Sequence, residues 1–374
     1  MLVFALSFAL VAAACTASSV PDTAEETPSP EVSEQPPSTT TPVPPPSSDA
    51  VLVPPPETAT ARNHVGYEFP PAPTYPEGPT DPDLAASITN LFNGLEVSLN
   101  LERLDEIAAS GDPRAAWLIV DLMRFIRPGD TLDVLTGSFQ ELTGTSLSED
   151  PIVQRSQWQS ATDHMIAWDI PALDEYQMWK GRLFTIIDDR WTPFFDDTGA
   201  DIDWRLLSWG GVLMDDRRVG TATPCARGCI PALDDPVVTS AAEGDWYPDD
   251  SIVFGVTIED EARAYPKYMM EVHVMVNDTL GGRRIGMPYC TLCGSAQAYL
   301  TDSVPQGIAQ PVLRTSGLLS RSNKVMFDLN TYSVFDTFTG RAVSGPLHAE
   351  GVTLDQVTVV TSTWGDWKQA HPET

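Results

Sequence analysis

Two cysteines lie three positions apart in a short apolar stretch, Cys290-Thr-Leu-Cys293, and Gly294 follows the second directly. The glycine lets the backbone turn tightly without a Cβ clash. Two thiols at this spacing have two common uses: they hold a soft metal ion, or they cycle between dithiol and disulfide. The stretch is therefore the most chemically informative part of the chain.

The chain has three further cysteines, Cys15, Cys225 and Cys229. With Cys15 set aside as part of an export signal, the other four form a C-x-x-x-C pair and a C-x-x-C pair. In an exported protein such a set predicts two disulfides, and it equally predicts a four-thiolate metal site. A thioredoxin-type C-x-x-C begins a helix, whereas residues 295–300 are typical of a strand. This difference favours a metal-binding or structural role.

A histidine, His273, lies on a predicted apolar strand upstream of the two thiols. A lone histidine in an apolar run is most often structural. The turn Thr279-Leu-Gly-Gly282 could pair this strand with the one that carries Cys290. Such a hairpin would create a site with two sulfur ligands and one nitrogen ligand, which suits copper(I) or zinc. We weigh the ligand role and the structural role of His273 equally.

The composition is strongly acidic, with 52 Asp and Glu residues against 22 Lys and Arg residues and a formal net charge of −30. A surface of this kind repels phosphate backbones and anionic lipid headgroups. We therefore expect no nucleic-acid partner, and no membrane attachment through a basic patch. The sequence specifies no protein partner.

The amino terminus, residues 1–15, has the length and the small terminal residues of a signal peptide. Its end, Ala12-Ala-Ala-Cys15, resembles a bacterial lipobox, in which the cysteine carries the lipid. Residues 16–82 are rich in Ser, Thr and Pro, a composition that favours a disordered tether over a packed core. We predict a protein held on the outer face of a bacterial cell membrane through lipidated Cys15, with secretion as the alternative.

Two differently patterned regions follow the tether. Residues 83–219 show helical periodicity, and Asp112-Pro113 is typical of an N-cap followed by proline in the first turn. The further helices are expected at 85–95, 101–109, 114–126, 131–142 and 152–168. Residues 220–374 contain short strands, including a hairpin around the acidic turn at 259–261, a strand over 272–276, and a final helix at 364–370. We predict an α+β multidomain protein, with an all-helical domain followed by a mainly antiparallel barrel or sandwich-like domain.

The second region, from about residue 224 to 374, resembles the bacterial domain-of-unknown-function family 3179. Four segments carry the resemblance: Ala262-Arg-Ala-Tyr-Pro266, His273-Val-Met-Val-Asn-Asp278, Tyr289-Cys-Thr-Leu-Cys-Gly-Ser-Ala296 and Ser322-Asn-Lys-Val-Met-Phe-Asp328. The resemblance implies that Cys290, Cys293 and His273 occupy the family's hallmark positions, but it supplies no reaction. Family members usually continue beyond the His371-Pro372 segment, so we expect the last strands of the family to lie outside this sequence.

The resemblance also bears on the other cysteine pair and on catalysis. Members commonly have no cysteines where Cys225 and Cys229 lie, which favours a local disulfide there. Family members commonly have a glutamate directly after the histidine, and Val274 takes its place here. The carboxylate that could act as acid or base is therefore absent, which argues against acid–base catalysis.

We interpret the chain as an exported, lipid-anchored protein that binds copper or zinc through Cys290, Cys293 and His273. Two alternatives stay open. One is a thiol–disulfide or metal-dependent oxidoreductase that uses the same cysteines, and the other is a disulfide-stapled interaction module.

Overall fold

The structure of the protein is a computed structural model, which describes residues 61–221, 225 and 227–374. The predicted signal segment, Cys15 and residues 16–60 of the predicted tether lie outside the described residues. The end of the predicted tether is packed against the protein: Arg62 and Glu68 form a β-bridge, and Phe69 is buried against the ring of His164. Within the described ranges, every helix is too short or too polar to cross a lipid bilayer.

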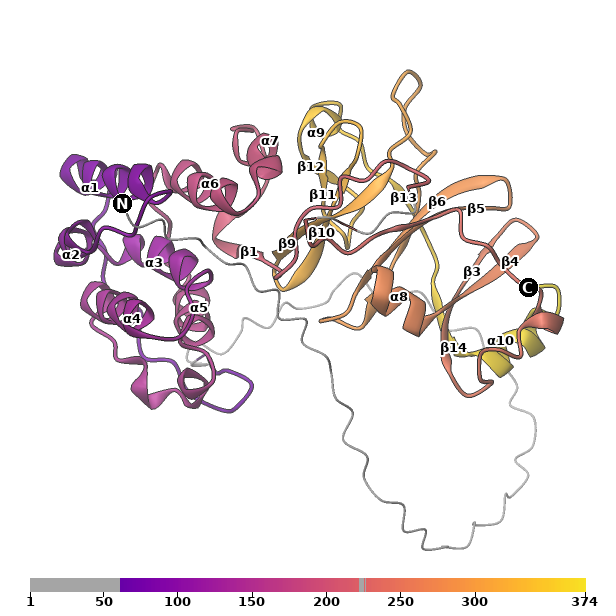
Figure 1. The fold of residues 1–374 in the computed structure, drawn as a ribbon, viewed down its shortest axis with the longest axis horizontal. Coiled ribbons are helices and arrows are strands. Elements are labelled where there is room, and N and C mark those ends of the chain that lie inside the picture. The colour runs from indigo at the N-terminus through magenta and orange to yellow at the C-terminus, as the bar shows by residue number, and fades with distance from the viewer. Residues whose placement is uncertain (1–60, 222–224, 226) are drawn as a thin grey trace, which may run out of the picture. The chain divides into compact units, whose positions relative to one another are not determined.

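Helices make up the first half of the described chain (Figure 1). Their N-termini follow the capping chemistry of the sequence, because the Asp112 carboxylate accepts from the Arg114 amide and Pro113 occupies the first turn. The predicted helix at 152–168 is broken at 155–156, where the Ser156 side chain caps a new helix. The α-helices are α1 (Pro82–Gly94), α2 (Leu101–Ala109), α3 (Ala116–Met123), α4 (Asp130–Thr143), α5 (Gln157–Trp168), α6 (Tyr176–Ile187) and α7 (Thr192–Phe195).

The second half of the described chain forms three sheets, antiparallel except for the parallel pair β2–β5. The first sheet has the order β1 (Leu207–Trp209), β9 (Leu313–Ser320), β10 (Asn323–Asp328), β11 (Val334–Phe335), β12 (Ala342–Ser344). The second has the order β13 (Asp355–Val357), β8 (Ala298–Leu300), β6 (Arg283–Cys290), β5 (Met275–Leu280), β2 (Leu233–Asp234), and β7 (Ser295–Ala296) pairs with β6. The third has the order β14 (Val360–Thr363), β3 (Ile252–Ile258), β4 (Glu261–Pro266).

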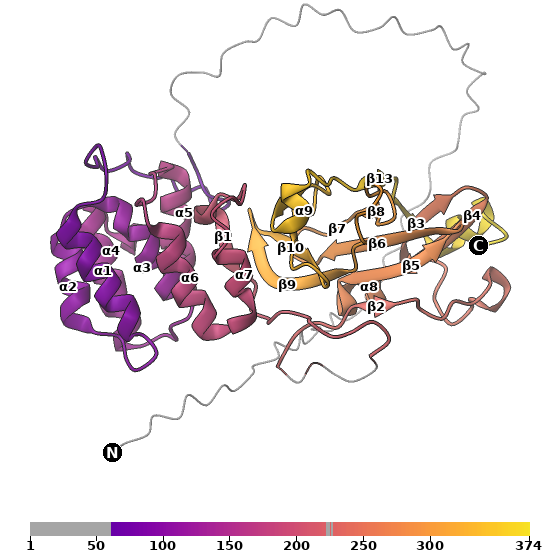
Figure 2. The same cartoon turned by 90° about the horizontal axis from the view of Figure 1, so that it is seen from above.

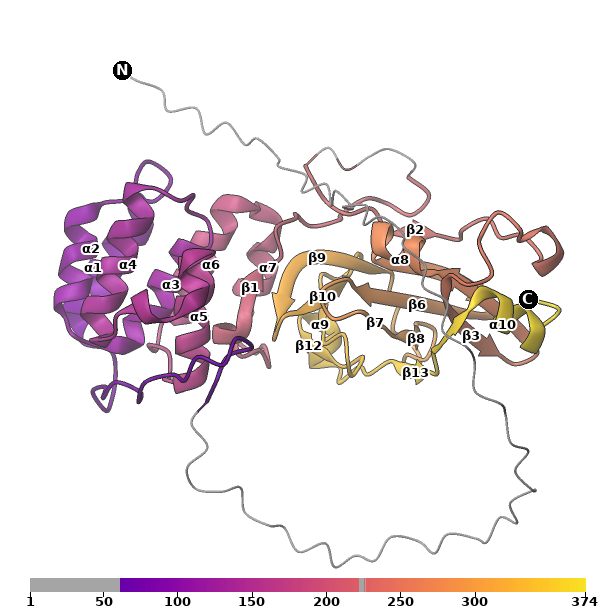
Figure 3. The ribbon, with the colours of Figure 1, turned by 90° about the horizontal axis from the view of Figure 1, so that it is seen from below.

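Shared cores join these sheets in a sandwich-like arrangement, and the described strands do not close into a barrel. Met275 and Tyr299 of the second sheet are buried together with Leu313 and Met326 of the first. The third sheet shares a separate apolar core with the second sheet, in which Phe254 and Val256 are buried together with Val276. Figure 2 shows β5 and β6 side by side, with α8 (Lys267–His273) beside them, and Figure 3 shows α8 near β6 from the opposite side. The remaining helices are α9 (Pro346–Ala349) and α10 (Trp364–Ala370), the latter with the predicted bounds.

The helical region and the first sheet also share a core. Leu318, Val325 and Phe327 belong to the same buried cluster as the helix side chains. The Trp191 indole adds a hydrogen bond to the Ser316 carbonyl. The sequence did not predict that the helices and the first sheet share a core. Apolar periodicity identifies the buried face of a helix or strand, but it does not identify the element that packs against that face.

One prediction about the strand-rich region was wrong in detail. The strand expected over 272–276 begins only at Met275, and His273 is instead the last residue of α8. Val274 takes a left-handed backbone conformation (φ 51°) between the helix and β5, so the helix ends there. The predicted barrel alternative is replaced by the sandwich-like arrangement.

Candidate functional site

A β-hairpin delivers the first thiol. Strands β5 and β6 pair in antiparallel register and turn at Gly281 and Gly282, whose φ angles of 55° and 72° fit a tight two-residue turn. Strand β6 ends at Cys290, and β7 then pairs back on it, so that Cys290 lies opposite Ser295. The intervening turn includes Gly294 with φ 63°, which is the conformation expected of a glycine after the second cysteine.

The two thiols of this turn lie unusually close together. The Sγ atoms of Cys290 and Cys293 are 2.8 Å apart, and neither cysteine is in a disulfide. A disulfide bond requires about 2.05 Å. Cys290 is buried and Cys293 is exposed, and Leu292 at the tip of the turn is 70% exposed. The pair therefore has one sulfur that an external molecule can approach and one held inside the protein.

A second turn, between β9 and β10, faces the thiols. Its two central residues, Arg321 and Ser322, have φ angles of 51° and 62°. Cys293 Sγ lies 3.5 Å from the Ser322 carbonyl oxygen and 3.5 Å from Asn323 Oδ1. Both atoms are hydrogen-bond acceptors, so each can accept a hydrogen bond from the Cys293 thiol. Neither can donate one to a thiolate, so they do not stabilise the deprotonated form.

This environment favours the protonated form of Cys293. Loss of solvent around Sγ, the hydrogen bond with Cys290 and the negative potential of Cys290 together raise the pKa of Cys293 to about 11. A reactive cysteine with a stabilised thiolate has the opposite shift.

A buried lysine, Lys324 of β10, lies near the end of β6. Its Nζ donates a hydrogen bond to the Val274 carbonyl oxygen, which also accepts from the amide of Tyr289 at 2.9 Å. Tyr289 precedes Cys290, so this shared oxygen brings the ammonium group next to the end of β6. Burial lowers the pKa of Lys324 to about 7, although the negative potentials of Cys290 and Asp215 act to raise it.

Two polar side-chain atoms beside the turn lack a partner among the described residues. They are Ser295 Oγ, directly after Gly294, and Gln297 Oε1, and both are buried. A buried polar atom without a hydrogen bond is costly, and such atoms are rare in native structures.

His273 lies near β6 but is not assembled with the thiols into a ligand group. Its Nδ1 is 2.8 Å from the Pro231 carbonyl oxygen. Among the described residues, one group of three or more His, Cys, Asp or Glu side chains has all ligand atoms within 4.8 Å, and it consists of Asp215, Cys225 and Cys229. The set His273, Cys290 and Cys293 does not meet that distance.

Cys225 and Cys229 are joined in a disulfide, in agreement with the local bond expected for this pair. Once reduced, the two thiols together with Asp215 could hold a metal ion. The Asp215 carboxylate already accepts from Arg217 Nε at 2.7 Å and from the Ala232 amide at 2.9 Å. In the disulfide form the cluster offers no thiolate to a metal ion. The Asp215 carboxylate then holds Arg217 and the Ala232 amide by hydrogen bonds.

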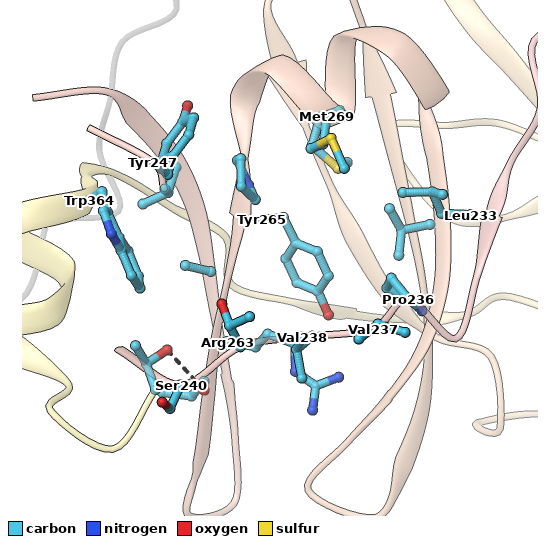
Figure 4. A pocket seen from close by; sticks show the side chains of 18 of the residues that line it. Leu233, Pro236, Val237, Val238, Ser240, Tyr247, Arg263, Tyr265, Met269 and Trp364 are labelled. Carbon is cyan, nitrogen blue, oxygen red and sulfur yellow. Dashed lines mark hydrogen bonds between the residues drawn. The ribbon is translucent and has the colours of Figure 1, made fainter. Parts of the chain in front are cut away.

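An apolar cavity of about 350 Å³ lies elsewhere, between β4, α8 and residues 236–240 (Figure 4). Tyr265, Met269 and Trp364 are among its walls, and the Tyr265 hydroxyl is satisfied by Asp278 at 2.9 Å. Neither Cys290 nor Cys293 lines this cavity. The thiol pair and this apolar cavity are thus separate features.

Sequence reasoning missed Lys324 and the acceptors on the opposite turn. The segment that contains them, Ser322 to Asp328, contributed only a family motif. The available signal was a lysine that directly precedes the apolar run Val325 to Phe327, because lysine is almost never fully buried unless it is paired.

Neither the curated proteins nor the solved structures gave a match to this chain. The scan against protein families did give one, to a family described as "Protein of unknown function (DUF3179)", and the matched segment includes every residue of the thiol site. Over residues 227–374 the chain is therefore similar to the DUF3179 family.

Proposed function

We propose that Cys290 and Cys293 are a redox pair that exchanges electrons with external thiols and disulfides. The observation that carries this proposal is the 2.8 Å separation of their sulfurs, with one thiol buried and the other exposed. Closing the bond requires a shift of under about 1 Å.

The exchange proceeds in two balanced steps. Cys293 Sγ, having lost its proton, attacks one sulfur of an external disulfide, so a mixed disulfide forms and one external thiolate leaves. Cys290 Sγ, having lost its proton, then attacks Cys293 Sγ. The mixed bond breaks, the Cys290–Cys293 disulfide forms, and the second external thiolate leaves. The two protons given up by the cysteines balance those taken up by the two external thiolates.

The environment of Cys293 supports a role for the pair on the reducing side of this exchange. Strongly oxidising pairs owe their potential to a reduced form that is stabilised as thiolate. Cys293 has the reverse shift, with its pKa raised to about 11. The pair thus acts as a dithiol that gives electrons to disulfides.

Copper or zinc binding by Cys290, Cys293 and His273 has less support. The His273 ring is held on Pro231, and its nitrogens are not within 4.8 Å of both sulfurs. The Cys293 sulfur faces two uncharged oxygen acceptors, whereas a metal site requires the thiolate.

The test is a redox titration of the full chain in dithiothreitol buffers, with thiols trapped by alkylation and assigned by peptide mass. We expect a two-electron transition at Cys290 and Cys293 that is absent from Cys290→Ser and from Cys293→Ser. A Cys225→Ser/Cys229→Ser variant is the matched control and should keep the transition. Reduced wild type should also reduce glutathione disulfide in a single turnover.

Two results would contradict the proposal. One is a pair that stays in the dithiol form at every potential. The other is stoichiometric copper or zinc in anaerobically purified wild type that is lost from the Cys290→Ser/Cys293→Ser variant, which would restore the metal site.

We also propose that the protein is lipid-anchored through Cys15 on the outer face of a bacterial cell membrane. Support comes from the Ala12-Ala-Ala-Cys15 motif and the Pro-rich stretch that follows it. Labelling with radioactive palmitate and fractionation test this. Wild type should be labelled and membrane-bound, and Cys15→Ser should be unlabelled. An unlabelled, secreted wild type would overturn the anchor.

A further inference from the structure

We propose that the cavity between β4, α8 and residues 236–240 binds an uncharged, apolar small molecule. Its volume is about 350 Å³, which lies towards the lower end of the range of about 300–1,000 Å³ for small-molecule sites. The ligand is therefore compact. Because neither Cys290 nor Cys293 lines this cavity, the site is independent of the proposed redox function.

One wall of the cavity belongs to the packed core. Met270 of α8 and Val276 of β5 line it, and both are buried in the core that the second and third sheets share. Side chains from segments far apart in the sequence, from Leu233 to Trp364, complete the walls (Figure 4). Core contacts hold Met270 and Val276 in place, so this wall exists without a ligand, as in most small-molecule sites.

The opposite wall, residues 236–240, is attached at its ends and packs loosely between them. The amides of Asp235 and Ala241 each donate a hydrogen bond to the backbone of a neighbouring segment. Among the described residues, no group accepts a hydrogen bond from the amide of Val237 or Val238. Their side chains are 99% and 52% exposed although both residues line the cavity. An apolar molecule at this wall would shield these valines from water, which favours binding.

The polar side chains of the walls already have partners within the protein. The Tyr265 hydroxyl donates to Asp278 at 2.9 Å, and the Trp364 indole donates to the Gly244 carbonyl oxygen at 3.0 Å. The Tyr247 hydroxyl is likewise bonded to a backbone carbonyl at 2.7 Å. A ligand therefore meets rings and aliphatic side chains. A polar ligand would lose its hydrogen bonds to water without replacing them, which is costly.

The charges at the cavity disfavour an ionic ligand. Arg263 is the only basic residue among those that line it, and its guanidinium pairs with Asp278 at 2.7 Å and with Glu261 at 2.5 Å. Glu373 adds a further negative charge, so an anion would be repelled. Glu261 and Glu373 are both exposed, and solvent screens their attraction for a cation. Such a weak attraction does not offset the cost of moving a cation into an apolar cavity.

Two fluorescent probes with the same ring system test the proposal on the full chain. N-phenyl-1-naphthylamine is uncharged, and 1-anilinonaphthalene-8-sulfonate carries a sulfonate on the same rings. We expect the uncharged probe to bind and the sulfonate to bind at least about tenfold more weakly, because a charge must be desolvated. Failure of the uncharged probe to bind, or equal affinities of the two probes, would overturn the proposal.

A pair of substitutions locates the binding. Val238→Asp puts a carboxylate on the cavity wall and should weaken binding of the uncharged probe about tenfold. Val219→Asp is the matched control, because Val219 is also half-exposed, at 50%, and does not line the cavity. Thermal unfolding should show that both variants are folded, since both valines are at the surface. Equal probe affinities of these two variants would contradict the assignment.

The redox function and the ligand site fail separately. The Cys290→Ser/Cys293→Ser variant lacks the redox pair, and it should bind the uncharged probe as tightly as wild type. Loss of probe binding in this variant would contradict the independence of the two sites.

Discussion

The indole Nε1 of Trp191 donates a hydrogen bond to the Ser316 carbonyl oxygen at 2.7 Å, although 125 residues separate the two. Trp191 follows α6, and Ser316 lies in β9, the strand that leads to the turn facing Cys293. The helical region therefore contacts the strand that carries one side of the thiol site.

Replacing this indole tests the contact. Trp191→Phe leaves the buried Ser316 carbonyl without its donor and removes side-chain volume, so we expect a loss of about 2 to 4 kcal/mol in unfolding free energy. Urea denaturation measures this loss. Trp246→Phe is the control, because Trp246 is 57% exposed and its replacement should change stability by under about 0.5 kcal/mol. Equal effects of the two variants would contradict the structural role of Trp191.

Close packing at Gly255 predicts a second effect. A Cβ at this position in β3 would lie 2.0 Å from Cζ3 of Trp367 in α10. Gly255→Ala should therefore cost about 1 to 3 kcal/mol of stability, because the indole must move. A Cβ at Gly137 in α4 would have no atom within 4 Å, and Gly137→Ala should stabilise the protein by about 0.5 to 1 kcal/mol. Thermal unfolding distinguishes the two, and a neutral Gly255→Ala would show that α10 does not pack closely on β3.

The lowered pKa of Lys324 predicts a pH-dependent stability. It is about 7 in the folded protein and about 10.4 in an unfolded chain, so between these values the unfolded chain binds a proton that the native protein does not. Over that window the contribution of Lys324 to the free energy of unfolding rises with pH. Lys324→Met lacks this contribution. Its stability relative to wild type should therefore be greatest at about pH 6.5 and should decrease towards about pH 9.5, as measured by urea denaturation. A difference that does not vary with pH would contradict a buried, titrating lysine.

The raised pKa of Cys293 predicts slow alkylation at neutral pH. Only the thiolate reacts with iodoacetamide. The alkylation rate at Cys293 should therefore keep rising towards about pH 11, whereas the rate for a free cysteine levels off above its pKa of about 8.5. Peptide mass spectrometry of the reduced protein gives the rate at Cys293 alone. In Cys290→Ser the hydrogen bond between the two thiols, which keeps the proton on Cys293, and the negative potential of Cys290 are lost, so the plateau should move to lower pH. Levelling below about pH 9 in wild type would exclude a thiol environment of this kind.

The sequence alone determined much of the local structure. Apolar periodicity and capping residues predicted the helical first half, including α2 with the observed bounds, because these signals act within a few residues. Strand alternation and turn glycines predicted the β3–β4 and β5–β6 hairpins, and Cys290 and Cys293 were identified from their spacing. The match to DUF3179 agrees with the motifs found in the sequence.

Tertiary structure alone decided what surrounds the two thiols. The turn at Ser322 and Asn323 reaches Cys293 only because β9 and β10 pair, and Lys324 lies near the end of β6 only because it and the Tyr289 amide both donate to the Val274 carbonyl oxygen. His273 was expected beside the sulfurs, but helix α8 continues to that residue and its ring bonds Pro231 instead. Spacing along the chain places the sulfurs relative to each other. Their protonation depends on burial and on charges distant in sequence, and only the packed fold supplies these.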